Sequence, residues 1–384
     1  MTTFKPAPLR HLHGLDHLRA FAITFVFLYH YGRIFPHPAW TNTISAFGWT
    51  GVDLFFVLSG YLIASQLFAG IAAGKGVDFP TFFIKRVFRI LPAYLLTLGV
   101  YVALPSFRER EALAPLWKYL TFTQNLGLDL RTQGTFSHAW SLCIEEQFYL
   151  VLPLVLIALL AMKQLRKGAW LLAFLFAGGF VLRAFCWDHF VAPFQGEDDA
   201  WVRWYTWLYY PTFCRLDGLL VGVSVAALFR FKPAVKARLQ PHGNLLLLAG
   251  IAVLTAAYFT CADPESYAAS VAGFPLTDLG YGSIVMGAVC QGSILDKYRT
   301  GITVRLATWS YVLYLTHKIV IHVTQNGLRA WGWDLESNAT FAVCTVACLV
   351  VAWLLNRLLE KPFLRLRNRV LQKRKQPMPA AVTV

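Results

Sequence analysis

Arg19 and His30 are two ionisable residues inside the first long apolar run of the chain, in the stretch RAFAITFVFLYH. Eleven helical residues at about 100° each return to within about 20° of the starting direction, so we expect both side chains on one face of one helix, about 16 Å apart. An ionisable residue at bilayer depth is costly and indicates a functional site. The alternative is that Arg19 extends its charge to the membrane surface and that His30 is a hydrogen-bonded packing residue.

Five further polar clusters lie in or beside other apolar runs, and their residue types suit two kinds of chemistry. A neutral imidazole can take a proton from a hydroxyl, and a carboxylate can orient that imidazole. Clustered arginines bind phosphates through charge-assisted hydrogen bonds. The clusters are GVDLFFVLSGYLI with Asp53, KRVFR with Lys85, Arg86 and Arg89, AWSLCIEEQFYL with Trp140, Ser141, Glu145, Glu146 and Tyr149, RLDGLLVG with Arg215 and Asp217, and SYVLYLTHKIVI with Tyr311, Tyr314 and His317.

Several of these residues also have a purely structural interpretation. The basic residues of KRVFR could only anchor the chain at the cytoplasmic surface, where Lys and Arg collect. Asp53 could cap a helix, because an acid near a helix N-terminus is favoured by the dipole. Arg215 and Asp217 could form an ion pair within a bundle, and His317 could be a packing residue. The external tryptophans and tyrosines could stack on sugar rings, although an interfacial aromatic belt is the simpler explanation.

The elements that must position these residues are membrane helices. The chain has 384 residues, of which 57% are hydrophobic and 14% charged, whereas soluble domains carry roughly 25% charged residues. With a mean hydropathy of +0.50, we predict an all-α polytopic membrane protein, and we attribute the net charge of +15 to topology and not to nucleic-acid binding. Apolar runs near the roughly 20 residues needed to span a bilayer predict a bundle of about ten transmembrane helices, at residues 18–36, 51–70, 88–105, 142–162, 169–187, 207–229, 244–260, 279–295, 303–325 and 339–358.

The distribution of charge predicts the orientation of the bundle. Lys and Arg concentrate in alternate connections and in the C-terminal tail, which predicts that both termini are cytoplasmic. Residues 74–89, GKGVDFPTFFIKRVFR, are expected to form a short amphipathic segment on the membrane surface that leads into the third span. This topology places Arg19, Arg86 and Arg89 at the inner surface, and it places in the outer half of the membrane His30, Asp53, Glu145, Glu146 and His317.

The chain divides into a membrane domain at residues 1–370 and a basic tail at residues 371–384 that we expect to be disordered. The N-terminus is polar and no small-residue cleavage site follows the first apolar run, so no cleavable signal peptide is expected, and no soluble domain is expected at either end. Seven cysteines are scattered without a Cys-x-x-Cys motif, which predicts neither a disulfide framework nor a metal site.

The clusters, taken in order from GLDHLRA to EKPFLRL, resemble the membrane-bound acyltransferase family 3, whose members acylate cell-surface glycans. Arg19 and His30 match the Arg-then-His motif of its first span. Arg86 and Arg89 match its Arg-x-x-Arg motif, and Glu145 takes the acidic position of WSLCIEEQFY. Further matching elements are GVDLFFVLSGYLI, RLDGLLVG, SYVLYLTHKIVI and EKPF.

The resemblance implies a ten-span bundle that takes an acyl group, most commonly acetyl, from cytoplasmic acyl-CoA. The acceptor would be a hydroxyl of an extracytoplasmic or lipid-linked glycan. Some relatives carry an additional external domain, which is not expected in this chain. One departure concerns the late histidine: relatives often have Trp-Pro beside it, whereas this chain has His317-Lys318-Ile319.

We therefore predict an integral O-acyltransferase of the cell membrane, in which His30 is the general base on the acceptor hydroxyl and Asp53 or Glu145 orients it. Acyl-CoA, above all acetyl-CoA, is the co-substrate, and no bound cofactor is expected. A covalent acyl-histidine intermediate is a variant of this mechanism. We assign the acyl-CoA phosphates to Arg19, Lys85, Arg86 and Arg89, and we assign the acceptor and the shape of the site to Trp140, Ser141, Glu146, Tyr149, Arg215, Asp217, Tyr311 and His317.

The rival interpretation is a secondary transporter or exporter of an acylated or anionic solute, with the intramembrane charges as ion or proton relays. The sequence shows neither two matching halves nor the Gly/Pro-broken helix pairs that many transporters have, which counts against this interpretation. A scaffold without chemistry would leave His30, Asp53 and Glu145 unexplained.

Overall fold

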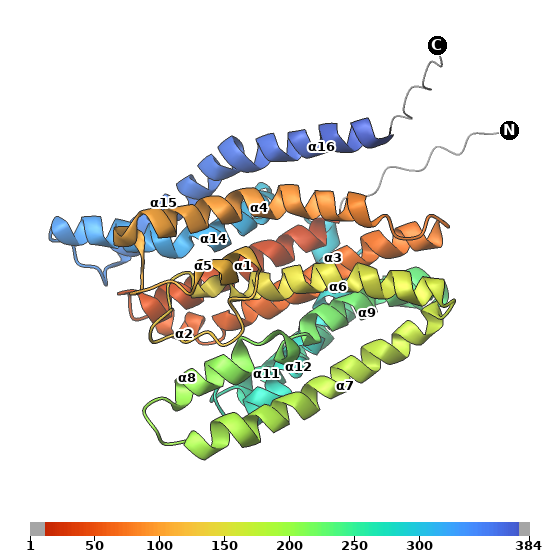
Figure 1. Cartoon of the computed structure of the whole chain (residues 1–384), viewed down its shortest axis with the longest axis horizontal. Helices are drawn as coiled ribbons and strands as arrows, with labels where there is room; N and C mark the ends of the chain where they lie inside the picture. Colours follow the sequence, from red (N-terminus) through yellow and green to blue (C-terminus); the bar gives the residue numbers. More distant parts are fainter. Residues whose placement is uncertain (1–11, 376–384) are drawn as a thin grey trace, which may run out of the picture.

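The computed structural model describes residues 12–375, and the regular secondary structure within them is entirely helical. This confirms the predicted all-α class. Most of the long helices run roughly along the longest axis of the molecule, which is horizontal in Figure 1. They are α1 His13–Ile34, α3 Gly51–Ala72, α4 Phe79–Ala103, α6 Trp140–Ala161, α7 Gly168–Cys186, α9 Asp217–Phe231, α11 Gly243–Thr260, α12 Phe274–Val289, α14 Gly301–Ala330, α15 Asn338–Leu355 and α16 Lys361–Lys375. The connections contain the short helices α2 Thr41–Ser45, α5 Leu116–Leu120, α8 Ala200–Trp204, α10 Pro233–Leu239 and α13 Ile294–Lys297.

Six helical segments within residues 12–375 are long and apolar enough to cross a bilayer. They are Gly48–Ala72, Phe79–Ala103, Ser137–Ala161, Leu165–Phe194, Pro233–Thr260 and Asn338–Arg374. The predicted spans at residues 18–36, 279–295 and 303–325 coincide with the helices α1, α12 and α14, which do not combine sufficient length with sufficiently apolar composition. The helices support a multi-pass membrane protein, and the number of ten spans stays a prediction.

The helix α1 packs against α14, α3 and α12, and α3 packs in turn against α9. Two glycines permit the close approach of α3 and α9. A Cβ atom on Gly60 would lie 2.2 Å from the carbonyl oxygen of Leu219, and one on Gly222 would lie 2.2 Å from the carbonyl oxygen of Val57. Small residues at helix crossings allow membrane helices to pack backbone against backbone. A larger side chain at either glycine would therefore separate α3 from α9.

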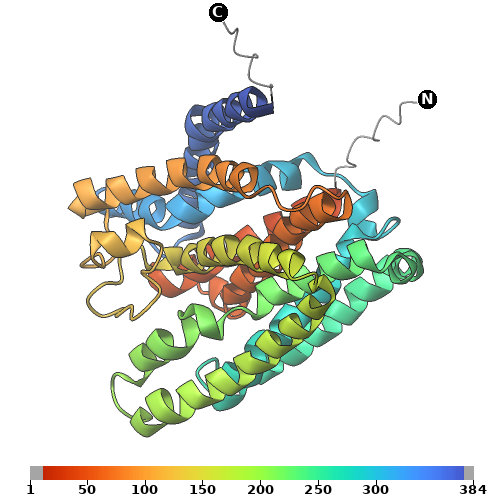
Figure 2. The same cartoon turned by 45° about the vertical axis from the view of Figure 1, so that its right-hand side comes forward.

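The first turn of α1 and the last turn of α16 lie toward the same end of the bundle, the right-hand end of Figure 1. The α3–α4 and α6–α7 connections lie at this end too, as predicted for the basic segments, while the side of the membrane that this end faces stays a prediction. In Figure 1 α16 runs beside α4 along one edge of the bundle, and Figure 2 shows both helices at that same edge. It runs to Lys375, past the predicted end of the membrane domain at residue 370, and residues 376–384 of the predicted tail lie outside the described residues.

The helix α4 starts earlier than the sequence suggested. The Asp78 carboxylate caps it by accepting a hydrogen bond from the backbone N–H of Thr81 (3.1 Å), and Pro80 stands in the first turn, where its missing N–H does no harm. Hydrogen bonding to Thr81, first to its side chain and then to its backbone N–H, lowers the pKa of Asp78. A separate surface segment at residues 74–89 was the wrong prediction, because the chain from Phe79 onward is one continuous helix that ends at Ala103.

The predicted span at residues 207–229 is not one helix. A helical segment ends at Tyr209, the chain turns at Pro211, and α9 begins only at Asp217. Proline has no backbone N–H with which to continue a helix, and Pro211 is itself extended, with φ −64° and ψ 135°. The apolar composition of this stretch hid the break. Arg215 and Asp217 therefore stand at the start of α9, not in the middle of a span.

Candidate functional site

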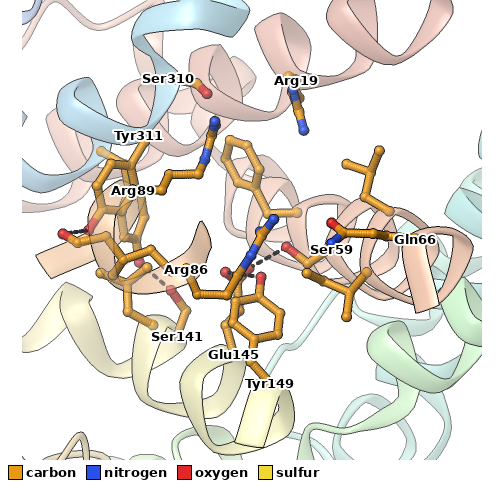
Figure 3. Close-up of a pocket in the computed structure, with 16 residues that line it drawn as sticks. Arg19, Ser59, Gln66, Arg86, Arg89, Ser141, Glu145, Tyr149, Ser310 and Tyr311 are labelled. Atoms are coloured by element: carbon orange, nitrogen blue, oxygen red, sulfur yellow. Dashed lines mark hydrogen bonds between the residues drawn. The ribbon is translucent and has the colours of Figure 1, made fainter. Parts of the chain in front are cut away.

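A cavity of about 270 Å³ lies between α1, α3, α4, α6 and α14 (Figure 3). The helices bring together residues that are distant in the sequence, and many of the predicted site residues are among them. Lys85, although predicted with its neighbours on α4, is not among the residues that line the cavity. The predicted residues that line it are Arg19, Arg86, Arg89, Ser141, Glu145, Tyr149 and Tyr311.

Three arginines give the cavity its charge. Arg86 and Arg89 are three residues apart on α4, a spacing that puts both on one face of a helix, and Arg19 comes from α1. The Arg86 guanidinium lies 5.9 Å from the centre of the Phe82 ring and 5.8 Å from that of Tyr149. Its buried Nε atom has no hydrogen-bond partner. Within residues 12–375, none of the three arginines forms an ion pair with a carboxylate.

The Glu145 carboxylate belongs to this cavity. One of its oxygens accepts a hydrogen bond from the Ser59 hydroxyl and the other from the Tyr149 hydroxyl, each at 2.9 Å (Figure 3). The sequence placed Glu145 beside His30 in the outer half of the membrane, whereas the structure places it with the arginines. Its neighbour Glu146 does not line the cavity, and one of its oxygens is buried without a hydrogen-bond partner.

His30 lies in a cluster of three histidines. Its Nδ1 atom is 3.0 Å from Nε2 of His317, and the two ring centres are 4.9 Å apart. The His138 ring lies 5.9 Å from the His30 ring and 5.2 Å from the His317 ring. His317 and His138 are 0% and 2% exposed, whereas His30 is only half-buried. His30 is thus the most accessible member of this cluster, although it is not among the residues that line the cavity. No group of three or more His, Cys, Asp or Glu side chains in residues 12–375 is arranged to hold a metal ion.

Sequence reasoning missed His138. The residue stands two positions before Trp140, and the short helical turn over residues 137–139 leads directly into α6. Its place beside a recognised polar cluster was a usable signal. Its spacing from His30 and His317 carried none, because three different segments supply the three rings.

Tyr314 connects the cavity with the histidine cluster. Its side chain lines the cavity, and its ring centre is 5.6 Å from that of His138. Its hydroxyl donates to the His138 carbonyl oxygen, so the contact of 2.7 Å with the Ser141 hydroxyl must be donated by Ser141. The predicted site residues Ser141 and Glu145 therefore lie on the arginine side of Tyr314, and His317 lies on the other side.

Asp53 and Arg215 form a buried ion pair, with 2.6 Å between the Asp53 carboxylate and an Arg215 terminal nitrogen. Both side chains are 1% exposed. The predicted contact between Asp53 and His30 is therefore not formed, because the carboxylate is engaged by Arg215. Trp140 belongs to this group, with its ring centre 5.6 Å from the Arg215 guanidinium.

Asp217 pairs with Arg183 of α7 and not with Arg215. The distance between the two charged groups is 2.5 Å, and the Arg183 guanidinium also donates to the Cys214 carbonyl oxygen. Arg183 is 0% exposed and was missed from the sequence, where it is a single charge near the end of an apolar run. Arg215 and Asp217 thus have partners on other helices. The separation of two positions between them in the sequence could not reveal these partners.

The helical bundle thus holds an arginine-lined cavity with a cluster of three imidazoles beside it. The acyltransferase family 3 profile, an acyltransferase domain, matches residues 12–357. The chain belongs to this family, which confirms the predicted resemblance.

Two curated relatives illustrate the similarity. The O-acetyltransferase OatA of Staphylococcus aureus is 29% identical over 335 residues, which cover 81% of this chain and 51% of that protein. YrhL of Bacillus subtilis, named as a candidate peptidoglycan O-acetyltransferase, is 29% identical over 335 residues, 81% of this chain and 49% of that protein. The chain spans about half the length of these relatives. No solved structure matches significantly.

Proposed function

We propose that this protein is an integral membrane O-acyltransferase that moves an acyl group, acetyl in the first instance, from cytoplasmic acyl-CoA to a hydroxyl of an extracytoplasmic or lipid-linked glycan. Both termini are cytoplasmic in this proposal. Membership of acyltransferase family 3 supports the reaction class. The names of the two relatives support acetyl as the acyl group and, in the case of YrhL, a glycan of the cell wall as the acceptor.

The observation that carries the proposal is the cavity with three arginines and no ion-paired carboxylate. Arg19, Arg86 and Arg89 concentrate positive charge where a bilayer-embedded protein would have to neutralise it. Coenzyme A carries a diphosphate and a further phosphate on its ribose, and planar guanidinium groups bind phosphate oxygens through paired hydrogen bonds. The ligand phosphates would thus pair with guanidinium groups that the Glu145 carboxylate, hydrogen-bonded to Ser59 and Tyr149, does not engage.

His30 is the general base in this proposal. Its half-buried imidazole takes the proton of the acceptor hydroxyl, whose oxygen attacks the thioester carbonyl carbon. The C–S bond then breaks, a C–O ester bond forms, and the proton from His30 goes to the departing CoA thiolate. Arg19 and His30 share one face of α1, about 16 Å apart along its axis, which the extended pantetheine arm of the donor would bridge.

The test is acyl transfer from labelled acetyl-CoA in lipid nanodiscs, with isolated peptidoglycan and other envelope glycans as acceptors. We expect His30→Gln to bind acetyl-CoA with unchanged affinity and to lose roughly 10²–10⁴-fold in kcat, the usual contribution of a general base. His322→Gln is the matched control, because His322 lies on α14 outside the cluster and contacts Asn326.

Full activity of His30→Gln would remove His30 from the mechanism. Binding of acetyl-CoA without transfer to any glycan by the wild type would shift the proposal to another acceptor. In sealed proteoliposomes, movement of an anionic solute across the bilayer without acyl transfer would favour the transporter.

A further inference from the structure

The hydrogen bonds of His317, whose ring contacts His30, determine which of the two His317 ring nitrogens carries a proton. Nδ1 of His317 is 2.8 Å from the carbonyl oxygen of Tyr314 and 3.1 Å from that of Leu313. A carbonyl oxygen can only accept, so Nδ1 of His317 must carry a proton. In a neutral imidazole the other nitrogen then has none, which makes Nε2 of His317 a hydrogen-bond acceptor.

The neutral form of His317 follows from its surroundings. The side chain is 0% exposed, and the next residue, Lys318, holds a buried ammonium group 2.7 Å from the Glu109 carboxylate. That carboxylate already compensates one buried cation. A second cation on His317 would have no counterion of its own among these groups, and burying an uncompensated charge is costly.

The contact between the two rings therefore has a defined direction. Nε2 of His317 accepts, so Nδ1 of His30, at 3.0 Å, must donate. The proton of a neutral His30 is then on Nδ1, and its Nε2 atom has the free lone pair. His138 cannot perform this task in the structure, because its Nε2 atom contacts the Leu315 carbonyl oxygen at 3.2 Å and its Nδ1 atom has no hydrogen-bond partner.

We propose that His317 is a positioning residue that holds His30 in the tautomer whose Nε2 atom is unprotonated and ready to accept the proton of the acceptor hydroxyl. The relay runs from the backbone carbonyls of α14 through His317 to His30, with no carboxylate in direct contact. After proton transfer, His30 is an imidazolium that still donates from Nδ1 to neutral His317. This inference rests on the proposed function for its catalytic meaning, whereas the tautomer itself is a property of the resting protein.

The first test is spectroscopic and does not require activity. The protein is labelled with ¹⁵N-histidine, and solid-state NMR of the wild type in lipid is compared with His30→Gln to assign the His30 signals. We expect a protonated Nδ1 and an unprotonated Nε2 on His30, and we expect the populations to change in His317→Asn. An unprotonated Nδ1 on His30 of the wild type would overturn the proposal, even if acyl transfer is confirmed.

The second test uses the geometry of the side-chain amides. In place of His317, a glutamine carbonyl reaches the former Nε2 position and can accept from His30, whereas an asparagine amide reaches only the Nδ1 position. We expect His317→Asn to lower kcat by about 10²-fold or more, within the range of general-base catalysis, and His317→Gln to recover most of that loss. The Kd for acetyl-CoA should not change in either variant.

A merely structural role of His317 would impair both variants alike and would not distinguish kcat from donor affinity. Equal activity of wild type and His317→Asn would overturn the proposal. If the wild type transfers no acyl group to any glycan, the proposed function fails, and the NMR measurement still decides the tautomer. His322→Gln is again the control on the same helix.

Discussion

Two sets of arginines inside this bundle differ in whether a carboxylate pairs with them. Arg183 and Arg215 are buried, and each is bound directly to an aspartate of another helix. Arg19, Arg86 and Arg89 border a cavity and have no ion-paired carboxylate in the described part of the chain. Since an unpaired charge inside a membrane protein is costly, the first set is explained by helix packing, and we propose that the second set is paired by the phosphates of a ligand.

The largest expected effect is a loss of stability when the buried ion pair of Arg183 and Asp217 is broken. Replacing one partner of a buried ion pair leaves the other charge uncompensated, which costs about 3–5 kcal/mol. We therefore expect Arg183→Leu to lower the thermal unfolding temperature in detergent strongly, or to prevent accumulation of folded protein. The control is Arg183→Leu with Asp217→Asn, which removes both charges and should recover much of the loss. A fully stable single variant would show that the pair does not hold α7 on α9.

An intermediate effect is expected from a substitution in the cavity, and it concerns the KM for acetyl-CoA and not the stability. Arg86→Gln should leave the unfolding temperature unchanged and raise the KM for acetyl-CoA roughly 10–100-fold, as for the loss of a charged hydrogen bond of about 1.5–3 kcal/mol. The matched control is Arg238→Gln, an exposed arginine on α10. Loss of stability with unchanged donor affinity would place Arg86 in the first set of arginines.

The smallest effect concerns the start of α4, which carries two of the cavity arginines. Asp78→Ala removes the cap and should cost about 1 kcal/mol of stability, measured as a small decrease in unfolding temperature. Since the pKa of Asp78 is lowered in the folded protein, the stabilisation is present at neutral pH and is lost as the pH falls through the folded pKa. The difference between wild type and variant should therefore disappear in acid. A difference that persists there would mean that the carboxylate does not act through its charge.

The sequence predicted the composition of the site better than its internal arrangement. The periodicity of α1 identified Arg19 and His30, and the Arg-x-x-Arg spacing on α4 identified two arginines that line the cavity. Each of these two patterns is a local feature within a single helix. Glu145 was assigned to His30 from membrane depth alone. This assignment was wrong because two residues at the same depth can lie on opposite sides of a bundle. Only the packing of α6 shows that Glu145 faces the arginines.

Residues with partners on other helices were beyond sequence reasoning. Arg183 is 34 positions from Asp217, and the Arg215 partner Asp53 is 162 positions away. His317 had a departure from the family pattern beside it, and yet its ring contacts His30 directly. The break before α9 was hidden because apolar composition does not distinguish one helix from two segments joined at Pro211.

The continuity of α1 between Arg19 and His30 has a consequence for the size of the donor. If the phosphates bind at Arg19 and the thioester reacts at His30, the helix between them works as a ruler of about 16 Å. Acetyl thioesters with a truncated arm carry the same reactive group but would be too short to satisfy both ends. A single residue inserted between Arg19 and His30 would rotate one side chain by about 100° about the helix axis relative to the other. The helix therefore sets the relative orientation of the two side chains as well as their separation.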